Sequence, residues 1–230
     1  MPNLATDRRH IAVARVVGTA AVATRLETGC RAEYLARSYP TVAAIMGRAP
    51  FMDLAAVFAA ETELDDAQFP DWIGQHRTDQ VLPYLSGVAA IDRLRCEAEG
   101  AAPDAAVAPA VAAALAADEW MRSRVRLHAA TRFGWFSVPA PSIWLAHFDA
   151  ALVDPAPEWR AEGILITRPG GTLRARRIGP AEHRILAGMR IGEAVDVATS
   201  AARALYPEAN IELAIKDIID SGAAATRRSS

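Results

Sequence analysis

Residues 34–61, "YLARSYPTVAAIMGRAPFMDLAAVFAAE", set two prolines and a glycine closely among apolar residues. In the second half of this stretch the apolar side chains recur at i, i+3, i+4 and i+7, which is one face of a helix; they are Phe51, Leu54, Ala55 and Phe58. Pro50 suits the first turn of that helix, and Gly47 suits the end of the helix before it, where a left-handed residue is favoured. The stretch predicts two short helices joined by a tight corner, a scaffold with no chemistry of its own.

Helical periodicity also extends through the rest of the first hundred residues. "PTVAAIM" from Pro40, "DDAQFPDWIGQH" and "PYLSGVAAIDRLRCEAEG" each predict a helix with an inward face. The side chains expected to face inward are Val42, Ile45, Met46, Phe69, Trp72, Ile73, Tyr84, Val88, Ile91 and Leu94. The alanine- and proline-rich residues 100–118 predict a linker that becomes a helix near Val107. We therefore expect a helical bundle domain over residues 1–105.

Strand patterns enter in the second half of the chain. "RVRLHAATRF", residues 124–133, alternates Val125, Leu127 and Ala129 with Arg124, Arg126 and His128, which predicts one strand with a buried face. "GILITRP" and "GTLRARRIG" predict a hairpin that turns at Pro169-Gly170-Gly171. Three helices should follow: one starts at Pro180, one stops at Pro207, and one runs from an Asn210 cap to Gly222. The fold class is thus α+β, with a winged-helix-like, peptide-recognition module over residues 106–222 and a disordered tail over residues 223–230.

Arginine is concentrated around this hairpin. The formal net charge of the chain is −2, which gives no general argument for nucleic acid. Residues 160–190 nevertheless hold seven arginines against two glutamates, a local excess of +5. The arginines proposed to bind a peptide or phosphates are Arg168, Arg174, Arg176, Arg177 and Arg184. Three interpretations stay open: a charged edge strand that discourages aggregation, a wing that holds phosphates, or an edge that accepts an acidic peptide as an extra strand.

Aromatic residues are densest in "FGWFSVPAPSIW", residues 133–144. Phe133, Trp135, Phe136 and Trp144 are typical of a protein interface, where large aromatics are enriched. Such a cluster also closes the seam between two domains, which is the commoner use of buried aromatics. We favour the seam, and we name these four residues as the predicted partner interface under the competing interpretation.

No pattern in the sequence predicts catalysis. The five histidines lack metal-ligand spacing, and there is no HExxH, Walker-type or GxSxG motif. We therefore expect a non-catalytic protein with no cofactor or metal. Cys30 and Cys96 lie far apart without a CxxC pair, there is no signal-peptide pattern, and no apolar run reaches the roughly 18 residues of a membrane span. These features predict two reduced thiols and a cytoplasmic location.

The order of motifs resembles a bacterial family whose label describes a DNA-binding domain. The resemblance is carried by the aromatic-Pro-x-Val, Gly and Phe-x-x-Leu-Ala series of "YPTVAAIMGRAPFMDLA", and by "FPDWI", "PYLSGVAAIDRLRCEA" and "RLHAATRF" with "SIW" after it. It spans roughly residues 25–148. The N-terminal "DRRHIAVARVV" and the acidic loop near Asp65 depart from the family pattern.

The resemblance implies an accessory role. Proteins of this family accompany multinuclear non-haem iron oxidases that modify cysteines in ribosomally made, copper-binding peptides such as bufferins and methanobactins. The accessory protein recognises the leader of the precursor peptide and presents its core to the oxidase, which carries the iron. The implied partners are therefore the oxidase and the precursor peptide, in a pathway of copper homeostasis. A DNA-binding regulator that uses the basic hairpin is the alternative, because a fold does not fix a function.

Overall fold

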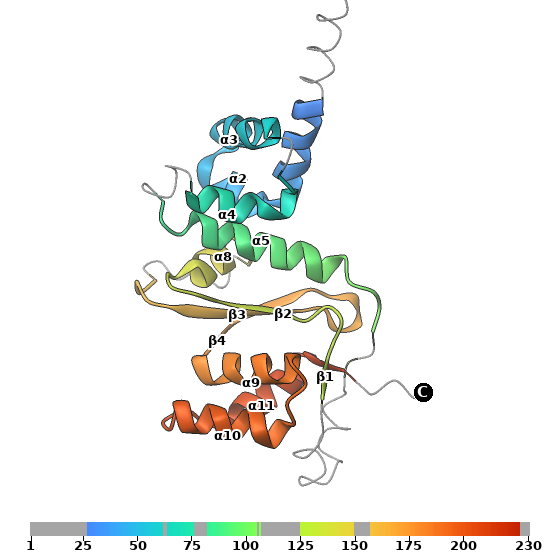
Figure 1. Cartoon of the computed structure of the whole chain (residues 1–230), viewed down its shortest axis with the longest axis vertical. Helices are drawn as coiled ribbons and strands as arrows, with labels where there is room; N and C mark the ends of the chain where they lie inside the picture. The colour runs from blue at the N-terminus through green and yellow to red at the C-terminus, as the bar shows by residue number, and fades with distance from the viewer. Residues whose placement is uncertain are drawn as a thin grey trace, which may run out of the picture.

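A computed structural model describes residues 27–61, 64–75, 82–104, 106, 125–149 and 157–225 of the chain. A three-stranded antiparallel sheet lies between two helical layers (Figure 1). The sheet has the order β2-β3-β4, with β2 at Arg132–Phe136, β3 at Glu162–Thr167 and β4 at Arg174–Ile178. Helices combined with small antiparallel sheets confirm the α+β class.

The upper layer in Figure 1 contains the helices of the first hundred residues together with one later helix. It comprises a helix over residues 27–38, α2 (Pro40–Met46), α3 (Arg48–Ala60), the 3-10 turn η1 (Asp66–Gln68), α4 (Phe69–Gln75), α5 (Leu85–Glu99) and α8 (Ala140–Phe148). The lower layer comprises α9 (Pro180–Arg190), α10 (Val195–Leu205) and α11 (Ile211–Asp220). A separate two-stranded sheet pairs β1 (Arg126–Leu127) with β5 (Ala224–Ala225).

The central strand β3 separates two hydrophobic cores. All six of its residues are buried, and alternate side chains point to opposite faces. Ile164 and Ile166 join the core of the upper layer, whereas Leu165 joins the core of the lower layer. A strand covered on both faces favours apolar residues throughout, as in "GILI", and the two buried polar residues at its ends, Glu162 and Thr167, form hydrogen bonds.

The helices of residues 34–99 form as the sequence predicts. Phe51, Ala55 and Phe58 are buried on α3, and Leu54 packs against the same core. Gly47 has φ of +83°, a conformation that glycine adopts without a steric penalty, at the corner between α2 and α3. Pro50 lies in the first turn of α3. The ten side chains expected to face inward from the other helices are all buried or packed against the upper core.

The hairpin and the last three helices also agree with the prediction. β3 and β4 pair antiparallel, and η4 (Pro169–Gly171) makes the turn with φ of +60° at Gly170. α9 starts at Pro180, α10 stops before Pro207, and the Asn210 side chain caps α11 by accepting a hydrogen bond from the N–H of Leu213 at 2.9 Å. Gly222 has φ of +71° just beyond α11.

The prediction of one strand over residues 124–133 is wrong. β1 ends at Leu127, the N–H of Thr131 bonds the carbonyl of His128 in a turn, and β2 starts at Arg132. His128, expected on the polar face, is buried because its ring bonds the carbonyl of Asp104 and the N–H of Ala130. The local alternation carried no information about this reversal, since β1 pairs with a strand almost a hundred residues later.

The expected domain limits also need adjustment. Ala223, Ala224 and Ala225 are buried, and the last two form β5, so a disordered tail cannot begin at residue 223. The upper core takes Ala140, Trp144 and Leu145 of α8 from beyond residue 105. The boundary between the two hydrophobic cores is therefore the three-stranded sheet and not residue 105. The linker and helix expected near Val107 fall outside the described residues.

Candidate binding surfaces

Two buried carboxylates hold the upper layer together. Asp92 of α5 accepts hydrogen bonds from Thr41 N at 2.9 Å, Thr41 Oγ1 at 2.8 Å, Val42 N at 3.4 Å and Trp144 Nε1 at 2.8 Å. It thereby caps α2, whose own N-cap residue, Tyr39, supplies no side-chain acceptor. Burial raises the pKa of Asp92, and the hydrogen bonds from Trp144 and Thr41 oppose that rise.

Glu162 does the same for α8. Its carboxylate accepts from Ser142 N at 3.0 Å and from Ser142 Oγ, at the first turn of a helix whose N-cap residue is Pro139. Both acids therefore stabilise the first turns of helices, and both side chains are buried. The Tyr39-Pro40 corner is thus part of a scaffold.

Most of the arginines that were predicted to bind a ligand form hydrogen bonds or ion pairs within the protein. Arg176 forms an ion pair with Glu182, Arg184 lies 2.9 Å from Glu193, and Arg177 lies 3.1 Å from Ser142 Oγ and 3.5 Å from Glu162. Arg168 donates to the carbonyls of Glu99 and Ala101 at the end of α5, where a cation is favoured by the helix dipole. Among the described residues, Arg174 has no hydrogen bond or ion pair and is exposed. Of the five arginines that the sequence suggested for binding, only Arg174 therefore has a guanidinium without a described partner.

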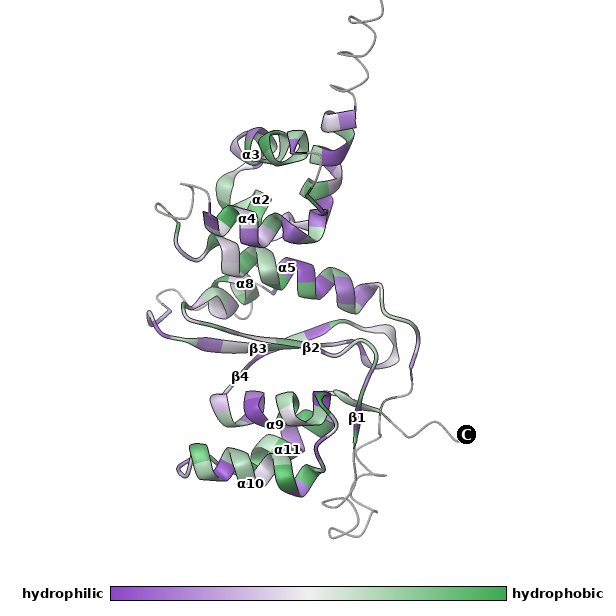
Figure 2. Ribbon diagram, in the orientation of Figure 1, coloured by the Kyte–Doolittle hydropathy of each residue, from purple (hydrophilic) through white to green (hydrophobic). Residues whose placement is uncertain are grey.

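The C-terminal half of α5 anchors the sheet. Figure 2 shows that this half is more hydrophilic than the first half. Its Glu97 is 2.9 Å from Arg132 of β2, and its last carbonyls receive Arg168 from the end of β3. Local arginine density in the sequence therefore reflects packing of the hairpin as well as any binding role.

A groove follows the outer edge of β4. Within the described strands, β4 pairs with β3 alone, so its other edge has no strand partner. The groove has a volume of about 580 Å³ and lies between the end of α8 and the end of α11. Its lining residues are Phe148, Asp149, Leu165, Thr167, Leu173, Arg174, Ala175, Arg176, Asp217, Asp220 and Ser221. An open edge with a groove beside it is the geometry that accepts an added strand.

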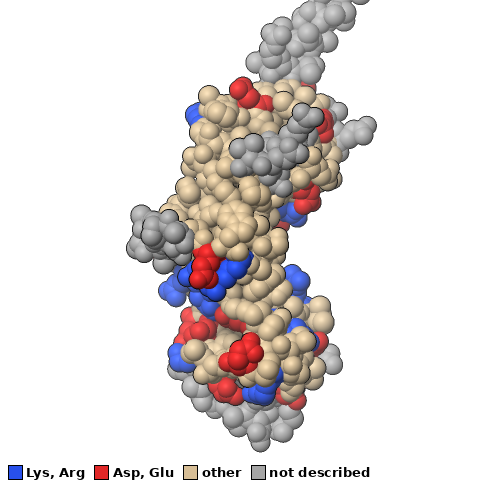
Figure 3. Space-filling model, turned by 90° about the vertical axis from the view of Figure 1, so that its left-hand side faces the viewer, with Lys and Arg blue, Asp and Glu red and all other residues tan. Residues whose placement is uncertain are grey.

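Charge in this groove is mixed. Arg174 and Arg176 line the groove together with three aspartates, and Arg176 is already paired with Glu182. Burial raises the pKa of Glu182, while the hydrogen bond and charge of Arg176 lower it. Figure 3, which views the left-hand side of the molecule, likewise shows basic and acidic side chains intermixed at the level of the sheet. The described surface near the hairpin is therefore far less basic than the arginine count suggests.

The four predicted interface aromatics divide between the interior and the surface. Phe133 is buried in the lower core, Trp144 is buried in the upper core, and Phe136 packs against the upper core. A partner cannot reach Phe133 or Trp144 without unfolding their surroundings, so the interface prediction is corrected for these two residues. The seam interpretation describes them: the faces of β2 point into the two cores. Trp135, with 39% of its surface exposed, lies at the surface beside His183.

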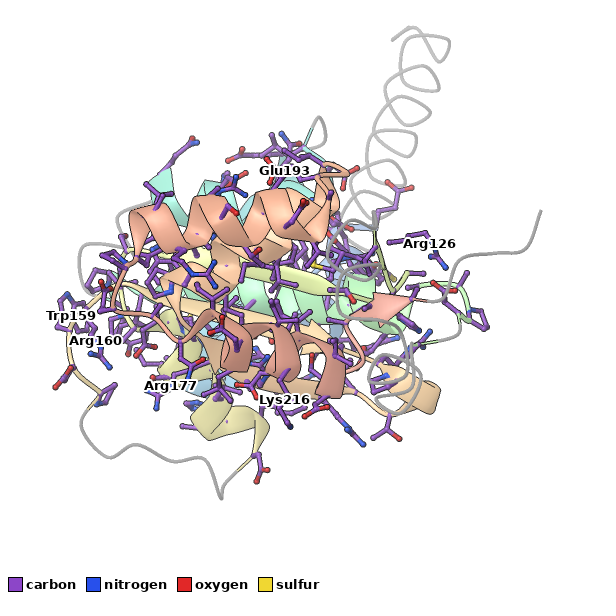
Figure 4. All side chains as sticks on the ribbon, turned by 90° about the horizontal axis from the view of Figure 1, so that it is seen from below. Arg126, Trp159, Arg160, Arg177, Glu193 and Lys216 are labelled. Atoms are coloured by element: carbon purple, nitrogen blue, oxygen red, sulfur yellow. The ribbon has the colours of Figure 1, made fainter. Side chains whose placement is uncertain are left out.

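Trp159 is an exposed aromatic residue that the sequence interpretation missed. It is 61% exposed, and its ring contacts that of Tyr84 at 6.4 Å between centroids. Figure 4 shows Trp159, Arg160 and Arg177 on the same side of the molecule. Trp135 belongs to the same end of the sheet, because it pairs with Gly163 at the start of β3. We call Tyr84, Trp135, Trp159, Arg160 and Arg177 the aromatic end. Its signal in the sequence was one tryptophan among charged residues, "PEWRAEG".

A second hollow, of about 280 Å³, lies in the upper layer beside Tyr39, Asp66 and Cys96. Burial raises the pKa of the Cys96 thiol, which keeps it protonated and weakly nucleophilic. In the described ranges no group of three or more His, Cys, Asp or Glu residues is placed to hold a metal ion. None of the described helices is long and apolar enough to cross a membrane.

No protein-family model, curated protein or solved structure matches this chain.

Proposed function

We propose that this protein is a non-catalytic partner subunit that binds a ribosomally made precursor peptide and presents it to a multinuclear non-haem iron oxidase for cysteine modification. The family resemblance in residues 25–148 suggests the identity of the partners. The observation that carries the proposal is the groove along the unpartnered edge of β4. On this proposal the protein works in the cytoplasm, where a precursor peptide is made.

The leader of the precursor would bind as a fourth strand beside β4. Main-chain hydrogen bonds to the free edge would provide affinity, and side chains that alternate between the two walls of the groove would provide specificity. Arg174, exposed and without a described partner, is the side chain best placed to recognise a carboxylate of the leader. In this proposal the β3–β4 hairpin and α9 to α11 act as a winged-helix-like recognition module.

The oxidase would dock at the aromatic end. Tryptophan and arginine are the residue types that most often dominate binding energy in protein interfaces. Trp159 exposes a large ring on the same side of the molecule as Arg160 and Arg177, and Trp135 exposes its ring at the same end of the sheet. This surface is at the start of β3, whereas the groove follows β4 toward the hairpin turn, so both partners have room to bind together.

The charge distribution favours a peptide over DNA. A duplex needs several cations free to replace counterions, and its affinity then falls steeply with salt. Here Arg176, Arg177 and Arg184 are paired with glutamates. Aspartates share the groove with Arg174. A DNA-binding regulator remains the rival proposal, and it predicts duplex binding with a strong salt dependence.

Co-purification tests the proposal. A tagged form of the protein is co-expressed with a multinuclear non-haem iron oxidase and a short cysteine-containing precursor peptide. We expect a ternary complex on size-exclusion chromatography, loss of the peptide in Arg174→Glu, and retention of the peptide in the matched control Arg37→Glu, an exposed arginine in the helix over residues 27–38. Absence of both the oxidase and the precursor from the complex, together with salt-dependent binding of duplex DNA, would support the rival.

A further inference from the structure

The two walls of the β4 groove differ in chemistry, and the register of the sheet assigns each side chain to a wall. Arg174 pairs with Thr167 and Arg176 with Leu165, and cross-strand partners lie on the same face. Leu165 belongs to the lower core and Arg176 reaches Glu182 of α9, so Arg174 and Arg176 point toward the lower layer. Leu173 and Ala175 pack against the upper core and point the other way.

The upper wall is mainly apolar. It consists of Leu173, Ala175 and the ring of Phe148, which is 37% exposed, with Asp149 at the end of α8 beside them. Phe148 is held in place by stacking on the buried Trp144, with centroids 4.8 Å apart and ring planes 16° from parallel. A rigid, half-exposed aromatic ring favours an apolar side chain opposite it.

The lower wall carries one uncommitted charge of each sign. Arg176 is paired with Glu182, and Asp220 is paired with Lys216. Of the lining side chains, Arg174 has no described hydrogen bond or ion pair, and neither has Asp217, although the charge of Asp217 acts on Glu182 and Lys216. Asp217 lies toward Arg176 and Glu182, whereas Arg174 lies toward Thr167, whose hydroxyl bonds Ser221 beyond α11.

From this arrangement we infer the pattern of the strand that the groove selects. It alternates apolar side chains toward α8 with polar ones toward α11, and two successive polar positions, i and i+2, carry one acidic and one basic residue. The acid faces Arg174 and the base faces Asp217. This inference rests on the proposed strand addition and adds the chemistry of the leader: a zwitterionic segment in place of a uniformly acidic one.

Three synthetic octapeptides test the pattern. Each is acetylated and amidated, with valine at even positions and threonine at positions 1 and 7. Positions 3 and 5 are Glu and Lys in the mixed probe, both Glu in the acidic probe, and both Lys in the basic probe. Binding is followed by chemical-shift changes of the ¹⁵N-labelled full chain, which report the site through the amides of β4 and the dissociation constant through titration.

We expect the mixed probe to bind about fivefold more tightly than either of the others, since an opposite-charge cross-strand pair is worth up to about 1 kcal/mol. Asp217→Asn should make the mixed and acidic probes equal, and Arg174→Gln should make the mixed and basic probes equal. Asp53→Asn on α3, remote from the groove, should change neither ratio. Each variant is first checked for the wild-type amide spectrum outside the groove.

The outcomes separate the two proposals. If the acidic or the basic probe binds as tightly as the mixed probe while β4 amides shift, the charge pattern is wrong and strand addition stands. If no probe shifts the β4 amides at millimolar concentration, strand addition at this edge is wrong, and the charge pattern falls with it.

Discussion

The upper and lower helical layers bury their polar groups in different ways. In the upper layer, Asp92 and Glu162 accept hydrogen bonds from the first turns of α2 and α8, helices that lie far from them in the chain. In the lower layer, α11 is capped by its own Asn210, and the buried Glu182 is neutralised by Arg176 at the open edge of the sheet. The upper layer thus depends on contacts between residues far apart in the chain, whereas the lower layer has a local helix cap and an ion pair at the open edge of the sheet.

The largest effect should come from Asp92→Ala. Removing this carboxylate leaves the N–H of Thr41 and the indole N–H of Trp144 buried without partners, and each unsatisfied donor costs about 1–3 kcal/mol. We expect a loss of about 3 kcal/mol or more in the free energy of unfolding, measured by urea denaturation. Asp53→Ala on the exposed face of α3 is the matched control and should change stability little. Equal losses in the two variants would show that Asp92 does not hold the upper layer.

Gly87→Ala should have the next largest effect. A Cβ at residue 87 would lie 2.8 Å from Cβ of Ala140, so α5 and α8 would have to separate. Overpacking of this kind destabilises by about 1–3 kcal/mol. Gly29→Ala, in the helix over residues 27–38 with no atom within 4 Å of the new Cβ, should be neutral or stabilising. Thermal unfolding of both variants measures how closely the upper layer is packed against the sheet.

His183 in the lower layer and Asp92 in the upper layer should contribute to the pH dependence of stability in opposite directions. Burial and the charge of Arg190 lower the pKa of His183 in the lower layer, so its imidazole binds a proton more weakly in the folded state. Its contribution to stability is therefore lost as the pH falls below 6.5. Between pH 7.5 and 5.5 we expect wild-type protein to lose more stability than His183→Gln, as measured by urea denaturation at each pH.

Asp92 has the reverse sign. Because burial raises its pKa above 3.8, the folded state holds the proton more tightly, and this contribution weakens as the pH rises from 3.8. The stability of wild-type protein relative to Asp92→Asn should therefore fall between pH 4 and 6. A constant difference over that range would mean that the hydrogen bonds to Asp92 fully offset its burial.

The smallest effect on stability should come from Trp159→Ala. The side chain is 61% exposed, so its removal should change the free energy of unfolding by about 0.5 kcal/mol or less. Under the proposed function the same variant should weaken co-elution with the oxidase while the precursor peptide stays bound. Leu205→Ala, an exposed apolar residue at the end of α10, is the control and should leave both partners bound. Loss of the peptide together with the oxidase would place both partners at one surface.

Local patterns predicted the helices because the apolar stripe, the cap and the terminating glycine of a helix all lie within or next to it in the sequence. The stripe at Phe51, Ala55 and Phe58, the positive φ at Gly47 and the Asn210 cap all depend on residues within a few positions. The apolar run of β3 likewise predicted a strand, and Pro169-Gly170-Gly171 predicted its turn. In each case the residues close by in the sequence were enough to predict the element.

Only the tertiary structure decided which polar and aromatic residues are available to a partner. Arg176 and Arg174 look alike in "RARR", but Arg176 meets Glu182, and no described side chain pairs with Arg174. Trp144 looks like an interface residue until Asp92 and the upper core surround it, whereas Trp159 looks isolated and lies exposed. The physical reason is that hydrophobic periodicity and caps act between near neighbours, while burial and ion pairing depend on residues brought together across the chain.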